Sequence, residues 1–575
     1  MKKIFFSVLS AMAVVSCLQV PSSYVTNHDW SEPANPVNVD PALWASVEAP
    51  EATFGSVDVR YPLSEPYAGT VSTSHALAGW KGEKVHAQVV VWTPSEIKDL
   101  TCEVGNFTDR SGGTLADIGR GRFVKYVLSD WFTPEKPCGV RKPGEPSRLM
   151  PDLLDEAPSL TVAANTSRPV WITVNIPHSA PAGTYTGEVR LRGKGFTREL
   201  TLTLDVVDRT LPPPSEWSYH LDLWQHPASV ARVEGVPVWS DEHFERMKTV
   251  MKPLAAAGQK VITATLNKEP WNNQCYDAYA DMIIWTRHPD GRWEYDFTVF
   301  DRWVGFMMEL GIKKMVNCYS MLPWNNMLHY RDGSTGQFVD VKADPGTPEF
   351  RMMWEPFLPA FESHLREKGW LEITNIAMDE RSPEAMAEAT SLLAAVAPEL
   401  GIALADNHKI FKTYPYIKDM CASIFGPIDR ADIADRRAKG LNTTFYVCCS
   451  SEFPNTFTFS DPAEAVYYAW HAAACDYDGF LRWTYNSWTE DPIRDSRFRT
   501  WAAGDTYIVY PEGRSSIRFE RTIEGIQDFE KMRILRAEPG NAAIIDSLLP
   551  PFSSGQRDAG WNDRLNAARQ LLNEM

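Results

Sequence analysis

The sequence predicts a multidomain protein in which an N-terminal antiparallel β-sandwich is followed by a (β/α)8 barrel of the TIM type. Three observations support this fold class. The chain has 575 residues, more than one hydrophobic core usually organises. Short alternating apolar runs broken by Gly and Pro fill the first part of the chain, as in antiparallel sheets. From residue 215 onward, strand, loop and helix patterns alternate, which is typical of parallel βα units.

The N-terminus resembles a bacterial export signal with a lipid attachment site. Two lysines precede an apolar run over residues 4–15, which is too short to span a bilayer. Val14-Val15-Ser16-Cys17 resembles a lipobox, so residues 1–17 are predicted to be a lipoprotein signal peptide with Cys17 as the acylated residue. A plain secretory signal with an incidental cysteine is the alternative. The prediction places the protein in the cell envelope, on its periplasmic or outer side, with lipid as its only membrane attachment.

Composition divides the rest of the chain into four segments. Residues 18–44 are polar and contain proline, which predicts a flexible tether. Residues 45–210 are predicted to form the sandwich, and the Pro-rich run at 211–214 marks its end. Residues 215–548 are predicted to form the catalytic barrel and residues 549–575 a C-terminal helical extension. The sandwich strands are expected within residues 84–92, 122–128, 170–176, 183–191 and 199–207.

Eight apolar runs in the second part predict the strands of a closed barrel. They cover residues 217–224, 261–266, 314–319, 371–378, 402–405, 422–425, 443–448 and 479–485. Amphipathic segments with capping or proline start signals are expected to be helices at 241–258, 350–369, 382–398 and 461–475. The sixth unit is the weakest, because its helix must come from the polar stretch 429–439. In such barrels, catalytic groups lie at the C-terminal ends of the strands.

Charge and composition exclude several classes of function. The net charge of −17 argues against nucleic acid or an anionic membrane surface as partner. No cysteine or histidine spacing suits a metal site, so neither a metal nor an organic cofactor is expected. Several of the eight cysteines after Cys17 lie in apolar runs that predict buried thiols, and their connectivity is open. The 21 Trp, 20 Tyr and 26 Phe residues point either to sugar stacking or to a large aromatic core.

Three Asp-Glu dipeptides are candidates for acid-base chemistry. Asp155-Glu156 lies in a polar, Pro-flanked loop, and Asp241-Glu242 begins a helix, where carboxylates favour the macrodipole. Asp379-Glu380 instead ends the fourth predicted barrel strand, just before a helix capped by Ser382. Two adjacent carboxyls cannot both ionise easily, so one can stay protonated and act as a general acid. Asp379 and Glu380 are therefore predicted to be catalytic, with a helix cap and a surface carboxylate as the alternative reading.

Several stretches of the barrel resemble glycoside hydrolase family 123. They are Met378-Asp379-Glu380-Arg381, the strand Phe480 to Trp488, Gly504 to Pro511, Ser516 to Glu520, and Glu524 to Asp528. The resemblance covers residues 217–535, and the sandwich ahead of it also suits the family. Because the family contains β-N-acetylgalactosaminidases, the resemblance implies a hydrolase that releases terminal β-linked N-acetylgalactosamine from glycans or glycolipids.

The resemblance also implies a retaining, substrate-assisted mechanism. The 2-acetamido oxygen of the sugar would attack the anomeric carbon and form an oxazoline intermediate. Asp379 would orient and polarise the acetamido N–H. Glu380 would protonate the leaving oxygen and later deprotonate water. These roles suit the two residue types, because an ionised Asp stabilises positive charge that develops on the acetamido nitrogen.

Two other functions stay open at this stage. One is a two-carboxylate retaining glycosidase in which Glu452, after the seventh strand, is the nucleophile. The other is a non-catalytic carbohydrate-binding lipoprotein on a degraded barrel. The sugar configuration, the type of cleavage and the oligomeric state are not determined by the sequence.

A sugar site also needs flat rings and polar groups at the other strand ends. The residues predicted to bind substrate on this basis are Trp224, His226, Asn267, Tyr319, Asn407, His408, Trp483, Tyr485, Asn486 and Trp488. For each ring taken alone, packing in the core is an equally good explanation.

Overall fold

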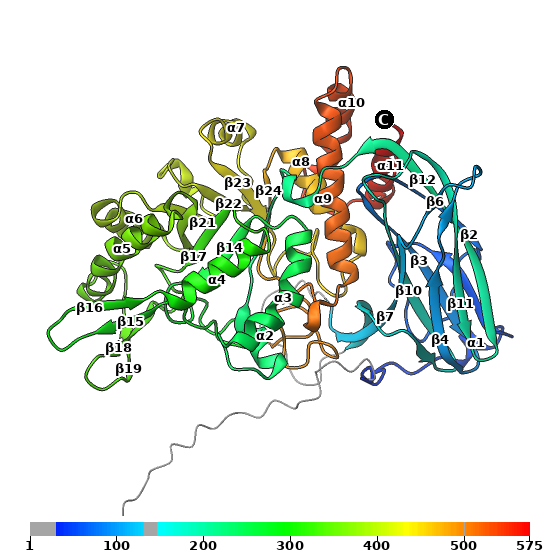
Figure 1. The fold of residues 1–575 in the computed structure, drawn as a ribbon, viewed down its shortest axis with the longest axis horizontal. Helices are drawn as coiled ribbons and strands as arrows, with labels where there is room; N and C mark the ends of the chain where they lie inside the picture. Colours follow the sequence, from blue (N-terminus) through cyan, green and yellow to red (C-terminus); the bar gives the residue numbers. More distant parts are fainter. Residues whose placement is uncertain (1–29, 132–146, 500) are drawn as a thin grey trace, which may run out of the picture.

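The computed structural model describes residues 30–131, 147–499 and 501–575. A β-sandwich and a barrel lie side by side, and long helices from the C-terminal part of the chain lie between them (Figure 1). The predicted fold class is confirmed. The predicted signal peptide and Cys17 fall outside the described residues.

The sandwich has two sheets around an apolar core. The first has the strand order β1 (Glu51–Gly55), β3 (Lys84–Thr93), β10 (Thr166–Asn175), β7 (Gly119–Ser129) and β8 (Arg148–Asp155). The second has the order β2 (Ser74–Lys81), β12 (Phe196–Thr210), β11 (Gly183–Gly193), β4 (Ile97–Val104) and β9 (Leu160–Val162), with the short β5 (Phe107–Thr108) and β6 (Thr114–Leu115) beside β11. Pairing is antiparallel except between β12 and β2. The five runs expected to be strands lie in β3, β7, β10, β11 and β12.

Part of the predicted tether is ordered against the sandwich, which corrects that prediction for residues 30–44. Trp30 and Trp44 are buried, and Trp44 ends the short helix α1 (Pro41–Trp44). Glu32 accepts two hydrogen bonds of 2.7 Å from the guanidinium of Arg168 on β10. A paired carboxylate and two buried indoles fix a segment whose composition alone is that of a linker.

Eight parallel strands form the barrel, and each overlaps one predicted run. In chain order they are β13 (His220–Leu223), β14 (Val261–Thr265), β17 (Met315–Tyr319), β20 (Thr374–Met378), β21 (Gly401–Asp406), β22 (Asp419–Ser423), β23 (Asn442–Tyr446) and β24 (Gly479–Arg482). The last strand pairs with the first, whereas β13 and β14 are joined by an isolated bridge between Leu221 and Gln259. The barrel is therefore nearly closed.

Helices follow most strands, as expected. They are α2 (Pro227–Glu234), α3 (Asp241–Ala256), α4 (Thr298–Glu309), α5 (Pro348–Lys368), α6 (Pro383–Val396), α7 (Arg430–Ala438), α8 (Pro462–Cys475) and α9 (Ile517–Arg536). The sixth unit does have its helix, α7. The fifth unit has instead a single 3-10 turn, Ile410–Lys412, between β21 and β22.

Strand alternation directs the catalytic candidate inward. On β20, Ile376 and Met378 pack in the outer core beneath the helices, whereas Ala377 belongs to the core cluster inside the barrel. Successive side chains of a strand point to opposite faces. Asp379, the next residue after the strand, therefore continues the inward series from Ala377.

A four-stranded sheet is inserted into the loops that follow β14 and β17. Its order is β16 (Trp293–Asp296), β15 (Ile284–Arg287), β18 (Met327–Asp332) and β19 (Phe338–Lys342). It forms the protruding lower left corner of the molecule in Figure 1. This sheet was not among the predicted elements, although the long intervals between the apolar runs leave room for it.

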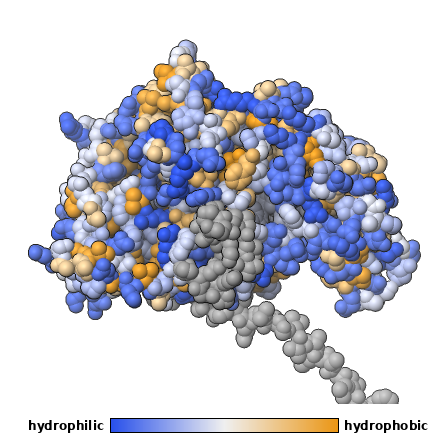
Figure 2. Space-filling view, turned by 180° about the vertical axis from the view of Figure 1, so that it is seen from behind, coloured by the Kyte–Doolittle hydropathy of each residue, from blue (hydrophilic) through white to orange (hydrophobic). Residues whose placement is uncertain are grey.

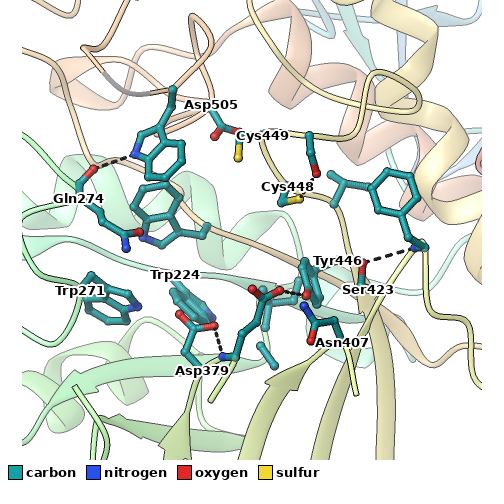
Figure 3. A pocket seen from close by; sticks show the side chains of 18 of the residues that line it. Trp224, Trp271, Gln274, Asp379, Asn407, Ser423, Tyr446, Cys448, Cys449 and Asp505 are labelled. Atoms are coloured by element: carbon teal, nitrogen blue, oxygen red, sulfur yellow. Dashed lines mark hydrogen bonds between the residues drawn. The ribbon is translucent and has the colours of Figure 1, made fainter. Parts of the chain in front are cut away.

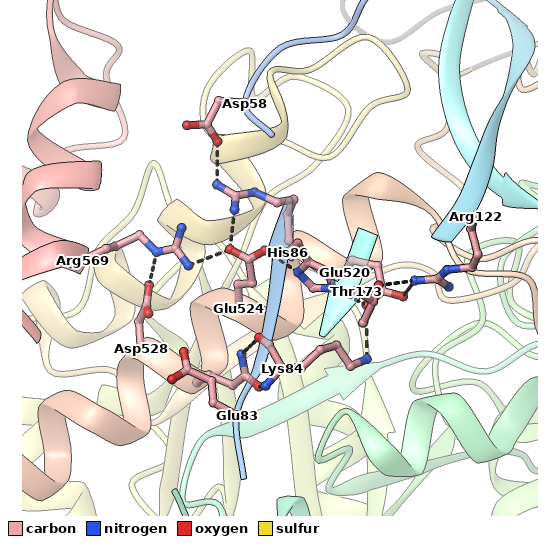
Figure 4. A network of polar contacts seen from close by, with 12 residues as sticks. Asp58, Glu83, Lys84, His86, Arg122, Thr173, Glu520, Glu524, Asp528 and Arg569 are labelled. Atoms are coloured by element: carbon pink, nitrogen blue, oxygen red, sulfur yellow. Dashed lines mark hydrogen bonds and ion pairs between the residues drawn. The ribbon is translucent and has the colours of Figure 1, made fainter. Parts of the chain in front are cut away.

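Helix α9 joins the two domains through a buried polar network (Figure 4). Glu520 accepts hydrogen bonds from Lys84 at 3.1 Å and from Arg122 at 2.9 Å, both on sandwich strands. Glu524 is 2.5 Å from Nδ1 of His86 and accepts a 2.6 Å bond from Arg569. Arg569 lies on α11 (Trp561–Glu574), which follows α10 (Asn541–Leu548). Charges from three parts of the chain thus hold the sandwich, the barrel and the C-terminus together.

The described surface carries no extensive apolar feature on the face in Figure 2, where hydrophobic residues form small groups among hydrophilic ones. Within residues 30–131, 147–499 and 501–575, no helix is both long and apolar enough to cross a membrane.

Candidate active site

A cavity of about 750 Å³ opens at the C-terminal end of the barrel. Each of the eight strands, or the loop after it, contributes to the wall. The lining residues are Trp224, Trp271, Gln274, Trp324, Asp379, Glu380, Ala405, Asn407, His408, Ser423, Phe425, Gly426, Tyr446, Val447, Cys448, Cys449, Ser450, Leu481, Trp483, Trp501 and Asp505. This is the position at which barrel enzymes carry their active sites.

The two predicted catalytic carboxylates both line this cavity. Strand β20 ends at Met378, so Asp379 keeps the inward direction of Ala377, whereas Glu380 lies far enough beyond the strand to be free of the alternation that would turn it away. The backbone N–H of Glu380 donates a 3.0 Å hydrogen bond to Oδ1 of Asp379. This turn allows two neighbouring side chains to reach one ligand, which a regular strand would prevent.

Trp324 holds the carboxylate of Asp379 from the other side. Its indole Nε1 donates a 3.0 Å hydrogen bond to Oδ2. Burial raises the pKa of Asp379 to about 6, the hydrogen bond from Trp324 opposes that rise, and the charge of Glu380 adds to it. Asp379 is therefore mostly ionised at neutral pH.

Tyr446 makes the corresponding contact with Glu380. Its hydroxyl donates a hydrogen bond to Oε1 of Glu380 from the last residue of β23. Burial and the neighbouring carboxylate raise the pKa of Tyr446, so the hydroxyl stays protonated and remains a donor. Each carboxylate of the pair thus has its own fixed donor from a different strand end.

Two loops of identical sequence supply the aromatic wall beside Asp379. Pro270-Trp271-Asn272-Asn273 follows β14, and Pro323-Trp324-Asn325-Asn326 follows β17. The loops are bonded to each other, because Trp324 N donates to the Pro270 carbonyl at 2.9 Å. Asn325 Nδ2 also donates to Oδ1 of Asn272 at 3.2 Å.

Further contacts lock these rings in place. The backbone N–H of Trp271 donates to the buried Glu269 at 2.7 Å, and Arg381 stacks over Trp324 with its guanidinium 5.6 Å from the ring. Trp224 packs 5.3 Å from Trp271 and completes the wall, as Figure 3 shows. The three indoles together give this side of the cavity a flat, apolar surface.

Six of the ten predicted binding residues do not line the cavity. They are His226, Asn267, Tyr319, Tyr485, Asn486 and Trp488, and all are buried. Asn486 accepts from the backbone N–H of His226 at 2.9 Å and donates to its carbonyl at 3.0 Å, so it joins β13 to β24. The hydroxyl of Tyr485 donates to the Val250 carbonyl on α3 at 2.9 Å. These residues stabilise the barrel rather than face a ligand, which corrects their assignment as binding residues.

The other three are also engaged within the protein. Trp488 Nε1 donates to the Val509 carbonyl at 2.8 Å. Asn267 bonds both backbone groups of His329, at 3.0 and 2.9 Å. Tyr319 is buried beneath Trp224, a residue of the cavity wall, and the centroids of the two rings are 4.4 Å apart. A residue's position just after a strand correctly predicted that it lies at the C-terminal end of the barrel. It did not predict whether the side chain points into the cavity.

The other four predicted binding residues, Trp224, Asn407, His408 and Trp483, line the cavity together with the carboxylates. Glu452, the alternative nucleophile, is exposed and lies outside the lining. The third lining carboxylate is Asp505, which is buried and paired at 3.1 Å with the equally buried Arg482.

Sequence reasoning missed several residues that matter here: Trp271, Trp324, Tyr446, Phe425 and Trp501. The repeated Pro-Trp-Asn-Asn motif after two successive strands was a usable signal for the first two. Tyr446 lies inside a predicted strand run, where a tyrosine has no distinguishing mark.

The described cysteines are mostly free thiols. Among the described residues, no cluster of His, Cys, Asp or Glu suits a metal ion. Cys102, Cys275, Cys318, Cys421, Cys448 and Cys475 are free thiols, and three of them are buried, as predicted for the apolar runs. Cys449, on the cavity wall, is disulfide-bonded.

Comparison with known proteins identifies both domains. The model of the glycoside hydrolase 123 catalytic domain matches residues 224–535, and that of the glycoside hydrolase 123 N-terminal domain matches residues 54–193. No curated protein matches the sequence.

Solved structures agree with the family models. A family 123 glycoside hydrolase from Clostridium perfringens, analysed for the details of glycolipid glycan hydrolysis, is 26% identical with a TM-score of 0.84. The match covers 92% of this chain and 98% of that one. A putative α-galactosidase from Bacteroides fragilis is 8% identical over 81% of this chain and 78% of its own, and its TM-score of 0.25 is too low to be informative. From the family models and the C. perfringens structure, the chain belongs to glycoside hydrolase family 123 and is a glycosidase.

Proposed function

We propose that the protein is a retaining β-N-acetylgalactosaminidase that removes terminal β-linked N-acetylgalactosamine from glycans or glycolipids by substrate-assisted catalysis. The observation that carries the proposal is the pairing of Asp379 and Glu380 on one cavity, each with its own donor, beside a wall of three indoles. No cofactor takes part in the chemistry.

The first step uses the acetamido group of the substrate as the nucleophile. Its carbonyl oxygen attacks the anomeric carbon while the glycosidic bond breaks, and Glu380 gives its proton to the leaving oxygen. Asp379 accepts a hydrogen bond from the acetamido N–H and stabilises the positive charge that develops on the nitrogen. The products are the free alcohol and a bound oxazolinium ion.

The second step restores the enzyme. Glu380, now ionised, takes a proton from a water molecule, and the oxygen of that water attacks the anomeric carbon. The bond between that carbon and the acetamido oxygen breaks, which regenerates the acetamido group with retained configuration. Tyr446 donates to Glu380 in its ionised state between the two steps.

The distribution of carboxylates favours the substrate as nucleophile. Of the described lining residues, Asp505 is the carboxylate left after Asp379 and Glu380, and its pairing with buried Arg482 makes it a poor nucleophile. The rival Glu452 is exposed and outside the cavity. The indole wall supplies the surface that an acetamido methyl needs.

The glycan or glycolipid substrate is inferred from the family and from its C. perfringens member, which was studied for glycolipid glycan hydrolysis. The net charge of −17 fits a neutral glycan better than a polyanion.

The test is hydrolysis of three aryl glycosides: the β-N-acetylgalactosaminide, the β-N-acetylglucosaminide, and the β-galactoside without an acetamido group. We expect cleavage of acetamido sugars alone, with retained configuration by NMR. Glu380→Gln should lose most activity on a poor leaving group and recover part of it on a dinitrophenyl leaving group, which needs no acid. Asp379→Asn should lose activity on every leaving group.

Glu452→Gln is the matched control, because it makes the same change on an exposed glutamate. Full activity of this variant, with cleavage restricted to acetamido sugars, supports the proposal. Cleavage of the β-galactoside without an acetamido group, or inactivity of Glu452→Gln, would show that the nucleophile is a residue of the protein and not the substrate. Glycan binding without turnover on any of the three sugars would support a carbohydrate-binding protein instead.

We also propose that Cys17 is acylated and that the lipid holds the enzyme on the envelope membrane. The support is the lipobox-like sequence Val14-Val15-Ser16-Cys17. The wild-type protein should incorporate labelled palmitate and fractionate with membranes, and Cys17→Ser should do neither. A soluble, unlabelled wild type would contradict the proposal.

A further inference from the structure

We propose that residues 30–44 form a membrane-contacting surface at the cavity end of the molecule, so that the cavity opens toward the bilayer that carries the lipid anchor. The partner is an uncharged lipid surface, because the net charge of −17 disfavours an anionic one. The inference rests on the proposed acylation of Cys17 and deepens the proposed function. It names the substrate as a glycan carried by a lipid of that same membrane.

The N-terminal end of the described chain lies against a loop that forms part of the cavity wall. The side chain of Arg494 donates a 2.9 Å hydrogen bond to the Ser31 carbonyl, and its guanidinium lies 5.8 Å from the centre of the Trp30 ring. Arg494 belongs to the long loop after β24, which also supplies Trp501 and Asp505 to the cavity lining. The chain therefore enters the folded body at the C-terminal end of the barrel, beside the cavity.

Hydrogen bonds fix this loop relative to both the N-terminal segment and the cavity. The Ser496 carbonyl accepts a 2.9 Å bond from the backbone N–H of Gly504, the residue before Asp505. The backbone N–H of Leu128 on β7 donates to the Arg494 carbonyl at 2.8 Å. The point at which residues 18–29 join the folded body is thus held at a constant position beside the cavity.

The C-terminus lies at the opposite end of the barrel. Arg209, near the end of β12, donates a 2.7 Å hydrogen bond to the carbonyl of Met575. Residues 211–219 lead from β12 directly to the first residue of β13, so this contact lies at the N-terminal end of the barrel strands. Figure 1 shows the C-terminus and α10 on the upper side of the molecule, and α1 and the inserted sheet along the lower side.

The length of chain before Trp30 limits how the molecule can lie on a membrane. Residues 17–30 span roughly 45 Å at full extension. A folded chain of 575 residues is about 60 Å across, so the path around it from one end to the other is roughly 100 Å. An acylated Cys17 therefore cannot bring the C-terminal end of the molecule onto the bilayer, whereas the cavity end is within its reach.

Three apolar side chains of the same segment are available for contact with lipid. Val37, Val39 and Leu43 are 51%, 38% and 45% exposed. Asp40 is the charged residue among positions 37–43. Exposed apolar side chains that are grouped in this way can enter the headgroup region of a bilayer. Three aliphatic side chains are too few to hold a protein on a membrane, so the lipid remains the attachment and this patch orients the molecule.

The orientation is tested on phosphatidylcholine vesicles that hold the protein by a histidine tag on a nickel-chelating lipid. The tag replaces Cys17 in one protein and follows Met575 in the other. A donor dye on a non-natural residue replaces either Phe425, which lines the cavity, or Ile544 on α10. With the N-terminal tag, energy transfer to an acceptor lipid should be stronger from position 425 than from position 544, and the C-terminal tag should reverse this order. Equal transfer from both positions in the N-terminally held protein would overturn the proposal.

The apolar patch is tested in the N-terminally held protein with the dye at position 425. Combining Val37→Ser, Val39→Ser and Leu43→Ser should lower the energy transfer by about half, because the cavity end is no longer held against the lipid. Ile544→Ser is the matched control, since Ile544 is also an exposed aliphatic residue but lies at the far end. It should leave the transfer unchanged. Unchanged transfer in the triple variant would overturn the role of residues 30–44 as a membrane-contacting surface.

Activity then tests the substrate. The same vesicles carry a glycolipid that ends in β-linked N-acetylgalactosamine, and the soluble aryl glycoside is the reference. The N-terminally held enzyme should cleave the glycolipid roughly tenfold faster than the C-terminally held enzyme, because only its cavity reaches the bilayer, whereas both should cleave the aryl glycoside equally fast. Equal rates on the glycolipid would overturn the substrate named here. If neither protein cleaves the aryl glycoside, the proposed function fails, but the energy transfer still decides the orientation.

Discussion

The indole N–H of Trp324 donates a 3.0 Å hydrogen bond to Oδ2 of Asp379. The two residues are 55 positions apart in the chain, on the loops after β17 and β20. The bond favours the ionised carboxylate and so opposes the effect of burial on the pKa of Asp379. It therefore sets the pH at which the proposed polarising charge appears.

The activity should fall on the acid side with an apparent pKa near 6, where Asp379 becomes protonated. Trp324→Phe removes the hydrogen bond, so the pKa of Asp379 should rise and this limb should move to higher pH by about one unit. The pH dependence of kcat/KM on an aryl substrate measures both. The indole of Trp501 donates to a backbone carbonyl and not to Asp379. Trp501→Phe should therefore lower the activity without shifting the acid limb of the pH profile. A limb that does not move in Trp324→Phe would contradict the assignment.

Asp379→Asn should inactivate the enzyme and stabilise it. The pKa of Asp379 is about 6 in the folded protein, above its ordinary value of 3.8. The unfolded chain therefore loses this proton more easily than the folded protein, and ionisation of Asp379 lowers the free energy of unfolding. Below pH 3.8 Asp379 is protonated in both the folded and the unfolded protein, so it does not lower the free energy of unfolding. The wild type loses stability as the pH rises from 3.8 through 6. The neutral variant should thus gain about 1–3 kcal/mol at pH 7 and nothing near pH 4. Urea unfolding at the two pH values tests this, and a less stable variant at pH 7 would refute it.

Tyr446→Phe should slow the enzyme most on substrates with poor leaving groups. The Tyr446 hydroxyl donates to Glu380, and this bond strengthens as Glu380 becomes a carboxylate during acid catalysis. We expect kcat to fall roughly ten- to hundredfold for a poor leaving group. The loss should be much smaller for a dinitrophenyl group. The measurement is kcat over a series of leaving-group pKa values, and a uniform loss across the series would argue against this role.

Glu524→Gln should destabilise the junction between the domains. Burial alone would raise the pKa of Glu524, but Arg521, Arg569 and His86 together lower it far below its ordinary value. Its contribution to stability is therefore present above about pH 4.5 and is lost as pH falls below that. At pH 7 the variant should lose about 3 kcal/mol, because the buried Arg521 and the part-buried Arg569 lose a partner.

Thermal unfolding at pH 7 and pH 4 measures the effect of Glu524→Gln, which should shrink at the lower pH. Glu538→Gln, at the more exposed pair with Arg209, is the control and should change little. If both variants were destabilised equally, the buried network would contribute no more to the stability than the more exposed pair does.

The buried network also explains why the C-terminal stretch resembles the family so clearly. Arg518, Glu520 and Glu524 are almost fully buried, and Arg518 pairs with Asp152 of the sandwich at 2.9 Å. None of the three lines the cavity. The stretch therefore reflects the contact between the two domains rather than the lining of the cavity.

The sequence predicted how many strands the barrel has and in which order they follow along the chain. It also predicted that Asp379 and Glu380 lie at the end of the fourth strand. Both depend on local patterns: apolar runs of strand length, capped helices between them, and a dipeptide at the end of the fourth run. Such patterns survive because every strand of a parallel barrel must be buried on both faces.

The tertiary structure alone decided which residues after the strands face the ligand. His226, Tyr485 and Trp488 come shortly after strands, yet they are buried away from the cavity, whereas Trp224, directly after β13, lines it. Trp324 and Tyr446 reach the carboxylates from distant parts of the chain. Beyond a strand end, alternation no longer fixes the direction of a side chain. That direction depends on loop contacts, such as the bond between the two Pro-Trp-Asn-Asn loops, which form only when the barrel has closed.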